Sequence, residues 1–333
     1  MQVDGTSSTI RWGILGTGGI AEKFARGLHS AQGVELVAVG SRSTKSAEAF
    51  GTEFDVPRRH ASYEALAADP DVDIIYVATP HPVHHEAVLL CQAAGKAVLC
   101  EKPFTVNARD AAELIENART KKLFLMEAMW SRYFPAMIRF RELIAEGAIG
   151  EPHLLQADFG FRTGVNPEGR LFKVELGGGA LLDVGVYVVS LASMIFGTPA
   201  AAAGIGQFGE TGVDELTAIT LAYSGGQIAQ LTCAIRTQTT VEATLFGSEG
   251  SLTIASPWYS PSRLTLARAG QEVESLDLPY VGNGYNYEAE EAGRCLREGL
   301  LESPTMPLDE TLQIVQTLDR IRAPWPVRYP GDA

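Results

Sequence analysis

Lys102 and its neighbours are the residues whose types and spacing point most directly to chemistry. The apolar run at positions 97–100 stops abruptly at Glu101, Lys102 and Pro103. This pattern is typical of a buried strand that delivers two charges to its carboxyl end. In an open α/β sheet that end faces the ligand crevice, so we expect Glu101 and Lys102 beside a cofactor. An ion pair exposed at a strand end is the alternative.

A second chemical pair, Asp183 and Tyr187, falls in a long apolar helix predicted after Gly177, Gly178 and Gly179. Side chains four residues apart on a helix share one face, so the carboxylate and the phenol are expected to point the same way. Both are therefore candidates for one site.

A glycine-rich turn near the start of the chain matches the dinucleotide-binding fingerprint. Residues 11–25 read as an apolar strand, a turn and a helix, and the turn has the spacing Gly16-x-Gly18-x-x-Ala21. Gly16 would allow the tight turn, Gly18 would let the backbone approach a pyrophosphate, and the helix N-terminus would offer N–H groups to it. The residues expected to bind the cofactor here are Gly16, Thr17, Gly18, Gly19 and Ile20.

The end of the second predicted strand, residues 34–40, indicates which dinucleotide is bound. NAD-binding chains usually carry an acid at this point for the ribose 2′-hydroxyl, but here Ser41, Arg42 and Lys45 follow instead. A guanidinium can bind a 2′-phosphate through two N–H groups at once. The sequence therefore favours NADP over NAD, and a solvated loop position for Arg42 is the alternative.

The third strand, predicted over residues 73–79, ends in a proline-bracketed loop. Thr79, Pro80, His81 and His84 are expected to lie beside the cofactor at this strand end. Imidazole and carboxylate side chains at 81, 84, 85 and 86 could suggest a zinc site. Because His84 begins a predicted helix, no metal is expected.

Two domains are expected to position these residues, since 333 residues exceed the size that one core usually supports. Residues 1–9 read as a flexible tail, and strands and helices alternate over residues 10–130, which predicts a Rossmann dinucleotide-binding domain. Residues 131–333 carry strand-like segments joined by short turns, which predict an open, mainly antiparallel sheet with helices on one face. Helices at about 285–299 and 308–322 are expected to pack back on the first domain.

Composition narrows the possible partners. A formal charge of −13 without a basic block argues against nucleic-acid binding. No continuous apolar run reaches the roughly 18 residues that a membrane span needs, and the start of the chain lacks a signal-peptide pattern. The four cysteines are scattered, so reduced thiols in a cytoplasmic protein are expected.

Three ordered motifs together resemble the Gfo/Idh/MocA oxidoreductases over about residues 10–325. They are the glycine turn, the stretch 94–103 and the stretch 177–187. Within the family, the chain most resembles the branch of dimeric dihydrodiol dehydrogenases and NADP-dependent D-xylose dehydrogenases. Many members of the family have histidine at the position of Tyr187, whereas tyrosine agrees with this branch. The resemblance implies Tyr187 as the acid/base, Lys102 as its partner, and a homodimer or tetramer formed through the outer face of the second domain's sheet.

Proton chemistry agrees with these implied roles. Oxidising an alcohol by hydride transfer needs a group that takes the hydroxyl proton. A free phenol, with a pKa of about 10, is a poor base near neutrality, and a neighbouring ammonium lowers that pKa. Asp183 could bond the substrate hydroxyl or hold Lys102, and the sequence leaves both possibilities open.

The predicted function is hydride transfer between NADP and a cyclic polyol, either an aldopyranose such as D-xylose or D-glucose at C1 or a trans-dihydrodiol. The alternatives are a catalytically silent NADP-binding sensor or scaffold, an NAD-dependent glycosidase, and an inositol-type dehydrogenase. Each expected pocket-wall residue could instead be ordinary core packing. Those residues are Trp130, Phe159, Phe161, Arg162 and Tyr285.

Overall fold

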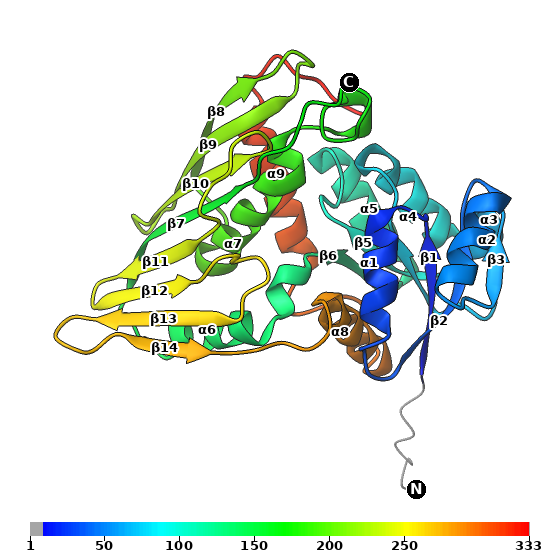
Figure 1. Ribbon diagram of the computed structural model, residues 1–333, viewed down its shortest axis with the longest axis horizontal. Helices are drawn as coiled ribbons and strands as arrows, with labels where there is room; N and C mark the ends of the chain where they lie inside the picture. The colour runs from blue at the N-terminus through cyan, green and yellow to red at the C-terminus, as the bar shows by residue number, and fades with distance from the viewer. Residues whose placement is uncertain (1–8, 333) are drawn as a thin grey trace, which may run out of the picture. The chain divides into compact units, whose positions relative to one another are not determined.

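The computed structural model describes residues 9–332, which divide into two compact units (Figure 1). Unit 1 comprises residues up to 104, then 111–130 and 281–308, and unit 2 comprises 105–110, 131–280 and 309 onward. Each unit is discontinuous in sequence, and the late segment 281–308 groups with the residues of the first predicted domain. The predicted tail lies outside the described residues, apart from Thr9.

Unit 1 is built on a six-stranded parallel sheet in the order β3-β2-β1-β4-β5-β6. The strands β1, β2 and β3 follow one another in one direction, and β4, β5 and β6 follow in the other. This is the strand order of the Rossmann fold, as predicted. The strands are β1 (Ile10–Leu15), β2 (Val34–Gly40), β3 (Arg58–His60), β4 (Ile74–Val77), β5 (Ala97–Glu101) and β6 (Leu125–Ala128).

Helices cover both faces of this sheet, because right-handed crossovers on the two sides of β1 place them on opposite faces. α1 packs against α8, which is why the late segment 281–308 belongs to unit 1. On the other face, Gln92 of α4 donates to the carbonyl of Leu114 in α5 at 3.0 Å. The helices are α1 (Gly19–Leu28), α2 (Thr44–Glu53), α3 (Tyr63–Ala67), η1 (His81–Val83), α4 (His84–Ala93), α5 (Ala108–Lys121), η2 (Trp130–Tyr133) and α8 (Tyr285–Arg297).

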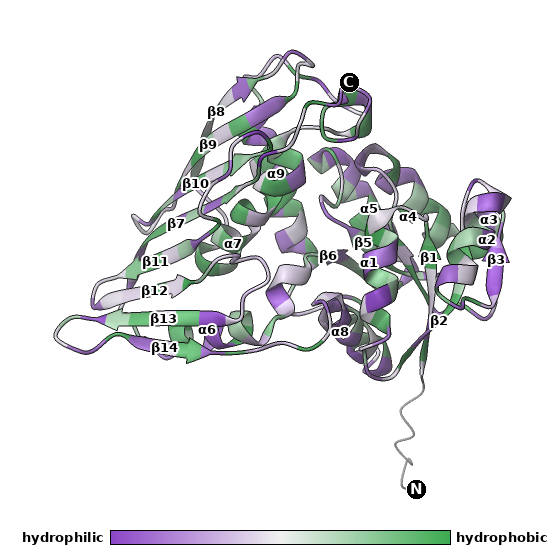
Figure 2. Ribbon diagram, in the orientation of Figure 1, coloured by the Kyte–Doolittle hydropathy of each residue, from purple (hydrophilic) through white to green (hydrophobic). Residues whose placement is uncertain are grey.

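Burial across this sheet follows the sequence pattern. β4 and β5 are buried along their whole length, as expected for parallel strands covered on both faces. The edge strand β3 is hydrophilic throughout (Figure 2), with the sequence Arg58-Arg59-His60. Charged side chains on an edge strand discourage pairing with another chain.

Unit 2 holds an eight-stranded sheet in the order β14-β13-β12-β11-β7-β10-β9-β8. Only β7 and β10 pair in parallel, so the predicted mainly antiparallel sheet is confirmed. The strands are β7 (Pro152–Gly160), β8 (Ala201–Phe208), β9 (Asp214–Ala222), β10 (Ile228–Ala234), β11 (Ala243–Gly247), β12 (Gly250–Ile254), β13 (Arg263–Arg268) and β14 (Glu274–Asp277).

Helices cover one face of this sheet and leave the other open (Figure 1). The stretch Val174–Phe196, which includes α7, is long and apolar enough to cross a membrane, but most of it is buried inside unit 2. We therefore assign it as the core helix of this unit. The helical segments are α6 (Pro135–Ala145), η3 (Val174–Leu176), η4 (Leu181–Gly185), α7 (Val186–Phe196) and α9 (Leu308–Arg322).

Candidate functional site

The glycine turn between β1 and α1 has the geometry of a dinucleotide cradle. Gly16 has a φ of +110°, and a Cβ there would lie 2.8 Å from the carbonyl oxygen of Ala78, so the position requires glycine. Gly18 and Gly19 are exposed, and a Cβ on either would meet no described atom within 4 Å. This open space at the start of α1 suits a pyrophosphate held by backbone N–H groups. Thr17 and Ile20, in the same turn, are half-buried.

The loop after β2 presents two exposed cations. Ser41 is buried, and Ser43 caps α2 by accepting from the N–H of Ser46 at 3.3 Å. Neither Arg42 nor Lys45 makes a hydrogen bond or an ion pair with any residue in the described part of the chain. Both side chains are therefore available to an anionic ligand.

His84 ties the ends of β4 and β5 together. Its ring is fully buried, with Nδ1 2.9 Å from the carbonyl oxygen of Pro103 and Nε2 2.9 Å from that of Thr79. Burial lowers the pKa of His84, and the bonds to the carbonyl oxygens of Pro103 and Thr79 oppose this shift. The hydroxyl of Thr79 is buried and has no partner among the described residues. An orphaned hydroxyl at a strand exit fits a bound ligand group.

Pro80 and His81 follow Thr79 in this loop. Pro80 occupies the position before η1, and the buried His81 ring packs edge-on against His84 at 5.8 Å. His84 begins α4, as predicted. Within residues 9–332, no group of three or more acidic, histidine or cysteine side chains has the geometry of a metal site.

Glu101, the last residue of β5, is held by hydrogen bonds and lies near a second buried carboxyl group. The hydroxyl of Tyr76 on β4 donates to Glu101, whose Oε2 accepts from the N–H of Lys102 at 3.1 Å. Burial raises the pKa of Tyr76 well above its ordinary value, so it remains a donor. Glu288 on α8 is completely buried, and neither of its carboxyl oxygens has a hydrogen-bond partner among residues 9–332. Burial and the nearby charge of Glu101 raise the pKa of Glu288 well above the ordinary range, which favours the neutral acid.

Two predicted pocket-wall residues meet in unit 1. Trp130 at the start of η2 and Tyr285 at the start of α8 stack with ring centroids 4.4 Å apart and an interplanar angle of 11°. Each side chain is almost fully buried. The sequence separates them by more than 150 positions, so only the packing of α8 within unit 1 brings them together.

In unit 2, Asp183 binds Arg170. The Asp183 carboxylate, on η4, is nearly buried, and its Oδ1 accepts from Arg170 Nη1 at 2.7 Å. Arg170 lies in the segment between β7 and η3 and is half-exposed. The sequence left a substrate hydroxyl and Lys102 open as partners of Asp183, and this arginine was not predicted.

Tyr187 lies in an aromatic cluster with Phe159 of β7 and Tyr259. Its ring is tilted against Phe159 at 5.2 Å and against Tyr259 at 6.2 Å, while Phe159 and Tyr259 stack at 4.3 Å. Tyr259 was not predicted from the sequence as a member of this site. Phe161 is half-buried just past β7, and Arg162 is exposed, so neither joins the cluster.

Both parts of the chain match models of one protein family. A model described as the oxidoreductase family with an NAD-binding Rossmann fold matches residues 10–129, and a Gfo/Idh/MocA C-terminal domain model matches residues 137–253. The trans-1,2-dihydrobenzene-1,2-diol dehydrogenase of Mus musculus is 41% identical, with 97% of this chain and 99% of the relative covered. The Homo sapiens enzyme of that name is 38% identical over the same shares.

A solved structure shows the same fold. KijD10, a 3-ketoreductase from Actinomadura kijaniata crystallised with NADP and TDP-benzene, has a TM-score of 0.84 and 26% identity. The alignment covers 95% of this chain and 98% of KijD10. KijD10 has also been crystallised with a lysine changed to alanine and with a tyrosine changed to phenylalanine.

Proposed function

The chain belongs to the Gfo/Idh/MocA family of oxidoreductases, and from this premise we propose that it is an NADP-dependent dehydrogenase of cyclic vicinal diols. The observation that carries the proposal is the buried Tyr187 in its aromatic cluster, one helical turn after Asp183. The 41% identity to a dihydrodiol dehydrogenase supports a trans-dihydrodiol as the substrate. An aldopyranose oxidised at C1 is the second substrate class.

NADP is the proposed cofactor because residues of unit 1 suit each of its parts. The open turn at Gly18 and Gly19 would hold the pyrophosphate, and Arg42 and Lys45 would hold the 2′-phosphate. Thr79, with its orphaned hydroxyl, and Glu101 would bind groups nearer the nicotinamide. NADP bound in the crystal of KijD10 supports this choice over NAD.

In the proposed mechanism, bound NADP supplies the hydride acceptor. Tyr187 takes the proton of the substrate hydroxyl during oxidation and returns it during reduction. Lys102 is the ammonium that stabilises the phenolate form of Tyr187. Arg170 orients the Asp183 carboxylate by donating to Oδ1, so that Asp183 can accept a hydrogen bond from a second hydroxyl of the diol.

Aromatic side chains support a flat, partly unsaturated ring as the substrate. Trp130 and Tyr285 form one stacked pair in unit 1, and Phe159 and Tyr259 form another in unit 2. Aromatic rings favour stacking with other flat rings and contribute about 0.5–1.5 kcal/mol for each pair beyond area burial. A dihydrodiol presents such a face together with two hydroxyl groups.

Steady-state kinetics with a trans-dihydrodiol, D-xylose and D-glucose, each with NADP and with NAD, test the proposal. We expect the dihydrodiol with NADP to give the highest kcat/KM. Bound NADP without turnover of any of the three would reject the dehydrogenase and favour a sensor or scaffold. Faster turnover of either sugar would show that the substrate is an aldopyranose and not a dihydrodiol.

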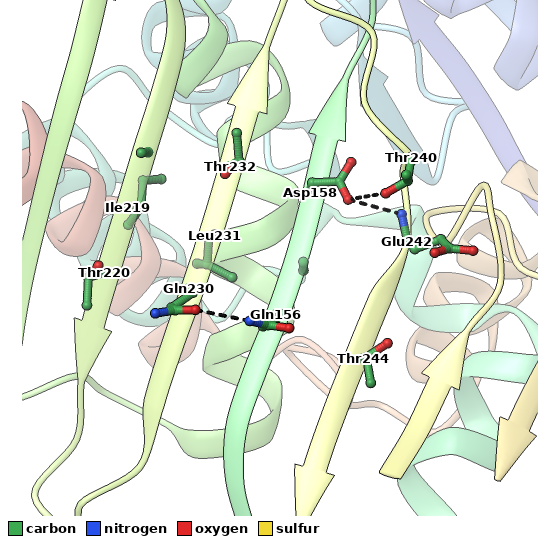
Figure 3. A pocket seen from close by; sticks show the side chains of 12 residues that line it. Gln156, Asp158, Ile219, Thr220, Gln230, Leu231, Thr232, Thr240, Glu242 and Thr244 are labelled. Atoms are coloured by element: carbon green, nitrogen blue, oxygen red, sulfur yellow. Dashed lines mark hydrogen bonds between the residues drawn. The ribbon is translucent and has the colours of Figure 1, made fainter. Parts of the chain in front are cut away.

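We also propose that the enzyme is a cytoplasmic homodimer assembled through the open face of the unit 2 sheet, here called the outer face. Its centre is a shallow hollow of about 490 Å³, where Gln156 and Gln230 are hydrogen-bonded at 3.1 Å (Figure 3). A stable two-chain mass in solution is the expected result, and a monomer would reject the dimer.

The cysteines support the proposed cytoplasmic location. All four are buried and free, as suits a reducing compartment.

A further inference from the structure

Asp214, the first residue of β9, is a buried carboxylate that the proposed reaction does not use. Its side chain has no solvent exposure. Oδ2 accepts from the backbone N–H of Leu181 at 2.8 Å and from the hydroxyl of Thr217 at 2.8 Å. Oδ1 has no hydrogen-bond partner in the part of the chain that the structure describes. All of these residues belong to unit 2.

The N–H group that Asp214 binds is at the start of the helix carrying the proposed chemistry. Leu181 begins η4, two residues before Asp183 and six before Tyr187. The first N–H groups of a helix have no acceptor within the helix, and a carboxylate there satisfies them and favours the helix dipole. The preceding residues, Gly177 to Ala180, have no side chain that could cap it. Asp214 therefore supplies the cap from a distant strand.

The glycine turn before η4 is held on two sides. Gly179 has a φ of +118°, and a Cβ at this position would overlap Oδ1 of Asp214. The buried hydroxyl of Tyr329, near the end of the chain, donates to the carbonyl oxygen of Gly178 at 2.7 Å. The start of the helix is thus fixed by contacts with β9 and with the C-terminal segment.

We propose that Asp214 is a positioning residue for the reaction, which through the Leu181 N–H fixes the start of the helix that carries Asp183 and Tyr187. Its effect on turnover rests on the proposed function. Its effect on the helix start does not, because that contact is independent of any substrate.

The charge on Asp214 changes near neutral pH. Burial raises its pKa to about 7, although the hydrogen bonds from Thr217 and Leu181 favour the ionised form. Above this pH the cap is a charge-assisted bond, and below it the neutral acid is a weaker acceptor. The surrounding titratable groups are Cys233 of β10 and Tyr329, both with pKa raised by burial, then Asp183 of η4, and beyond Tyr329 the ion pair of Arg322 with Asp332.

Hydrogen exchange of the whole protein tests the helix-start role without any substrate. Amide protection of the segment 180–187, corrected for intrinsic exchange, should rise roughly tenfold as pH passes upward through about 7 in the wild type. Asp214→Asn should show no such transition. A transition of equal size in Asp214→Asn, or none in the wild type, would overturn the proposal.

Thr217→Val provides a second variant if Asp214→Asn does not fold. It keeps the side-chain shape and removes one hydrogen bond to the carboxylate, so the midpoint should move upward by about one pH unit. An unmoved midpoint would show that another group produces the transition.

The effect on turnover is tested in the direction of ketone reduction. In this direction Tyr187 must be protonated to donate its proton, so the activity falls as pH rises. Ionisation of Asp214 strengthens the cap over the same pH change and should raise the activity, so the two pH effects are separable. With NADPH and an α-hydroxyketone, we expect Asp214→Asn to lower kcat roughly tenfold above neutral pH and to leave the KM for NADPH unchanged. A wild-type kcat profile in this variant would refute the positioning role. If the wild type turns over no substrate but shows the exchange transition, the proposed function fails while the cap stands.

Discussion

At the scale of single residues, the proposed chemistry depends most directly on the hydroxyl of Tyr187. We predict that Tyr187→Phe lowers kcat by roughly 10²–10⁴-fold, because it removes the proton acceptor but keeps the ring packed against Phe159. Affinity for NADP should not change, since the proposed cofactor-binding residues belong to unit 1. Steady-state kinetics and titration with NADPH measure both quantities.

Tyr259→Phe is the matched control for this experiment. Tyr259 belongs to the same aromatic cluster and stacks on Phe159 at 4.3 Å, so the variant loses a hydroxyl from the same surroundings. We expect its kcat to stay within about threefold of wild type. Near-normal turnover in Tyr187→Phe would assign the acid/base role to another residue.

Arg42 carries the prediction about cofactor choice. Because its exposed guanidinium is unpaired within residues 9–332, Arg42→Ala should weaken NADP binding by roughly 10–100-fold and NAD binding only slightly. Binding titrations with the two reduced cofactors give the ratio. Arg297→Ala is the control, since Arg297 contacts Gly33 at the opposite end of β2. Equal weakening of NADP and NAD in Arg42→Ala would contradict a 2′-phosphate role.

Residue chemistry was easier to predict than residue partners. The sequence places Lys102 after an apolar strand and Asp183 one turn before Tyr187, because local spacing determines both arrangements. The bond from Arg170 to Asp183 depends on the path of an irregular segment, which no spacing rule describes. The same is true of Asp214, whose contact with Leu181 joins residues 33 positions apart.

At the scale of secondary-structure elements, the turn from β1 to α1 should tolerate no side chain at its first glycine. Gly16→Ala would bring a Cβ to 2.8 Å from a backbone carbonyl, and the turn must shift to relieve this contact. We expect NADP binding to weaken more than tenfold, as measured by NADPH titration. Gly95→Ala is the matched control, because Gly95 also has positive φ but open space around its Cα. It should cost about 1–2 kcal/mol of stability and leave NADP binding unchanged.

The edge strand β3 depends on Asp69, which gives a second prediction at this scale. The buried Asp69 carboxylate accepts two bonds from Arg58 at 2.6 and 2.8 Å and lies 2.8 Å from Nε2 of His60. Although burial opposes ionisation, these bonds lower its pKa from 3.8 to about 2. Because the folded pKa is depressed, the stabilisation is present above about pH 4 and is lost as pH falls towards 2.

We therefore predict that Asp69→Asn lowers the free energy of unfolding at neutral pH by about 2 kcal/mol. Urea unfolding at several pH values should show this difference shrinking as the solution is acidified below about pH 4. Asp71→Asn is the control, because the Asp71 side chain is half-exposed and its ion pairs with Arg11 and Arg58 are screened by water. A pH-independent difference in Asp69→Asn would assign the effect to packing.

Elements with a strong hydrophobic pattern were predictable, and those without one were not. The apolar runs of β4 and β5 and the glycine turn before α1 were identified from the sequence and are confirmed. β8 was not predicted, because its sequence Ala-Ala-Ala-Gly-Ile-Gly-Gln-Phe has few residues that favour strands. It forms because β9 pairs with it over eight positions, which is information from the tertiary fold.

At the scale of the whole molecule, the outer face of the unit 2 sheet has the features of an interaction surface. Paired positions on adjacent strands place Phe246, Leu154 and Ile228 in one apolar row across β11, β7 and β10. Ile228 and Phe246 are 41% and 37% exposed, beside the polar hollow around Gln156 and Gln230 (Figure 3). Contiguous apolar surface rimmed by polar groups marks an interaction site.

Assembly through this face can be tested with one substitution and a matched control. Ile228→Glu places a charge in the apolar row, and in a two-fold interface it introduces that charge twice. We expect the mass measured by light scattering to fall from that of two chains to that of one, with little change in the unfolding of the single chain. Ile138→Glu is the control, because Ile138 on α6 is exposed to a similar extent, 43%, but lies on a helix that covers the other face of the sheet. Dissociation by Ile138→Glu alone would move the subunit contact to the helix-covered side of unit 2.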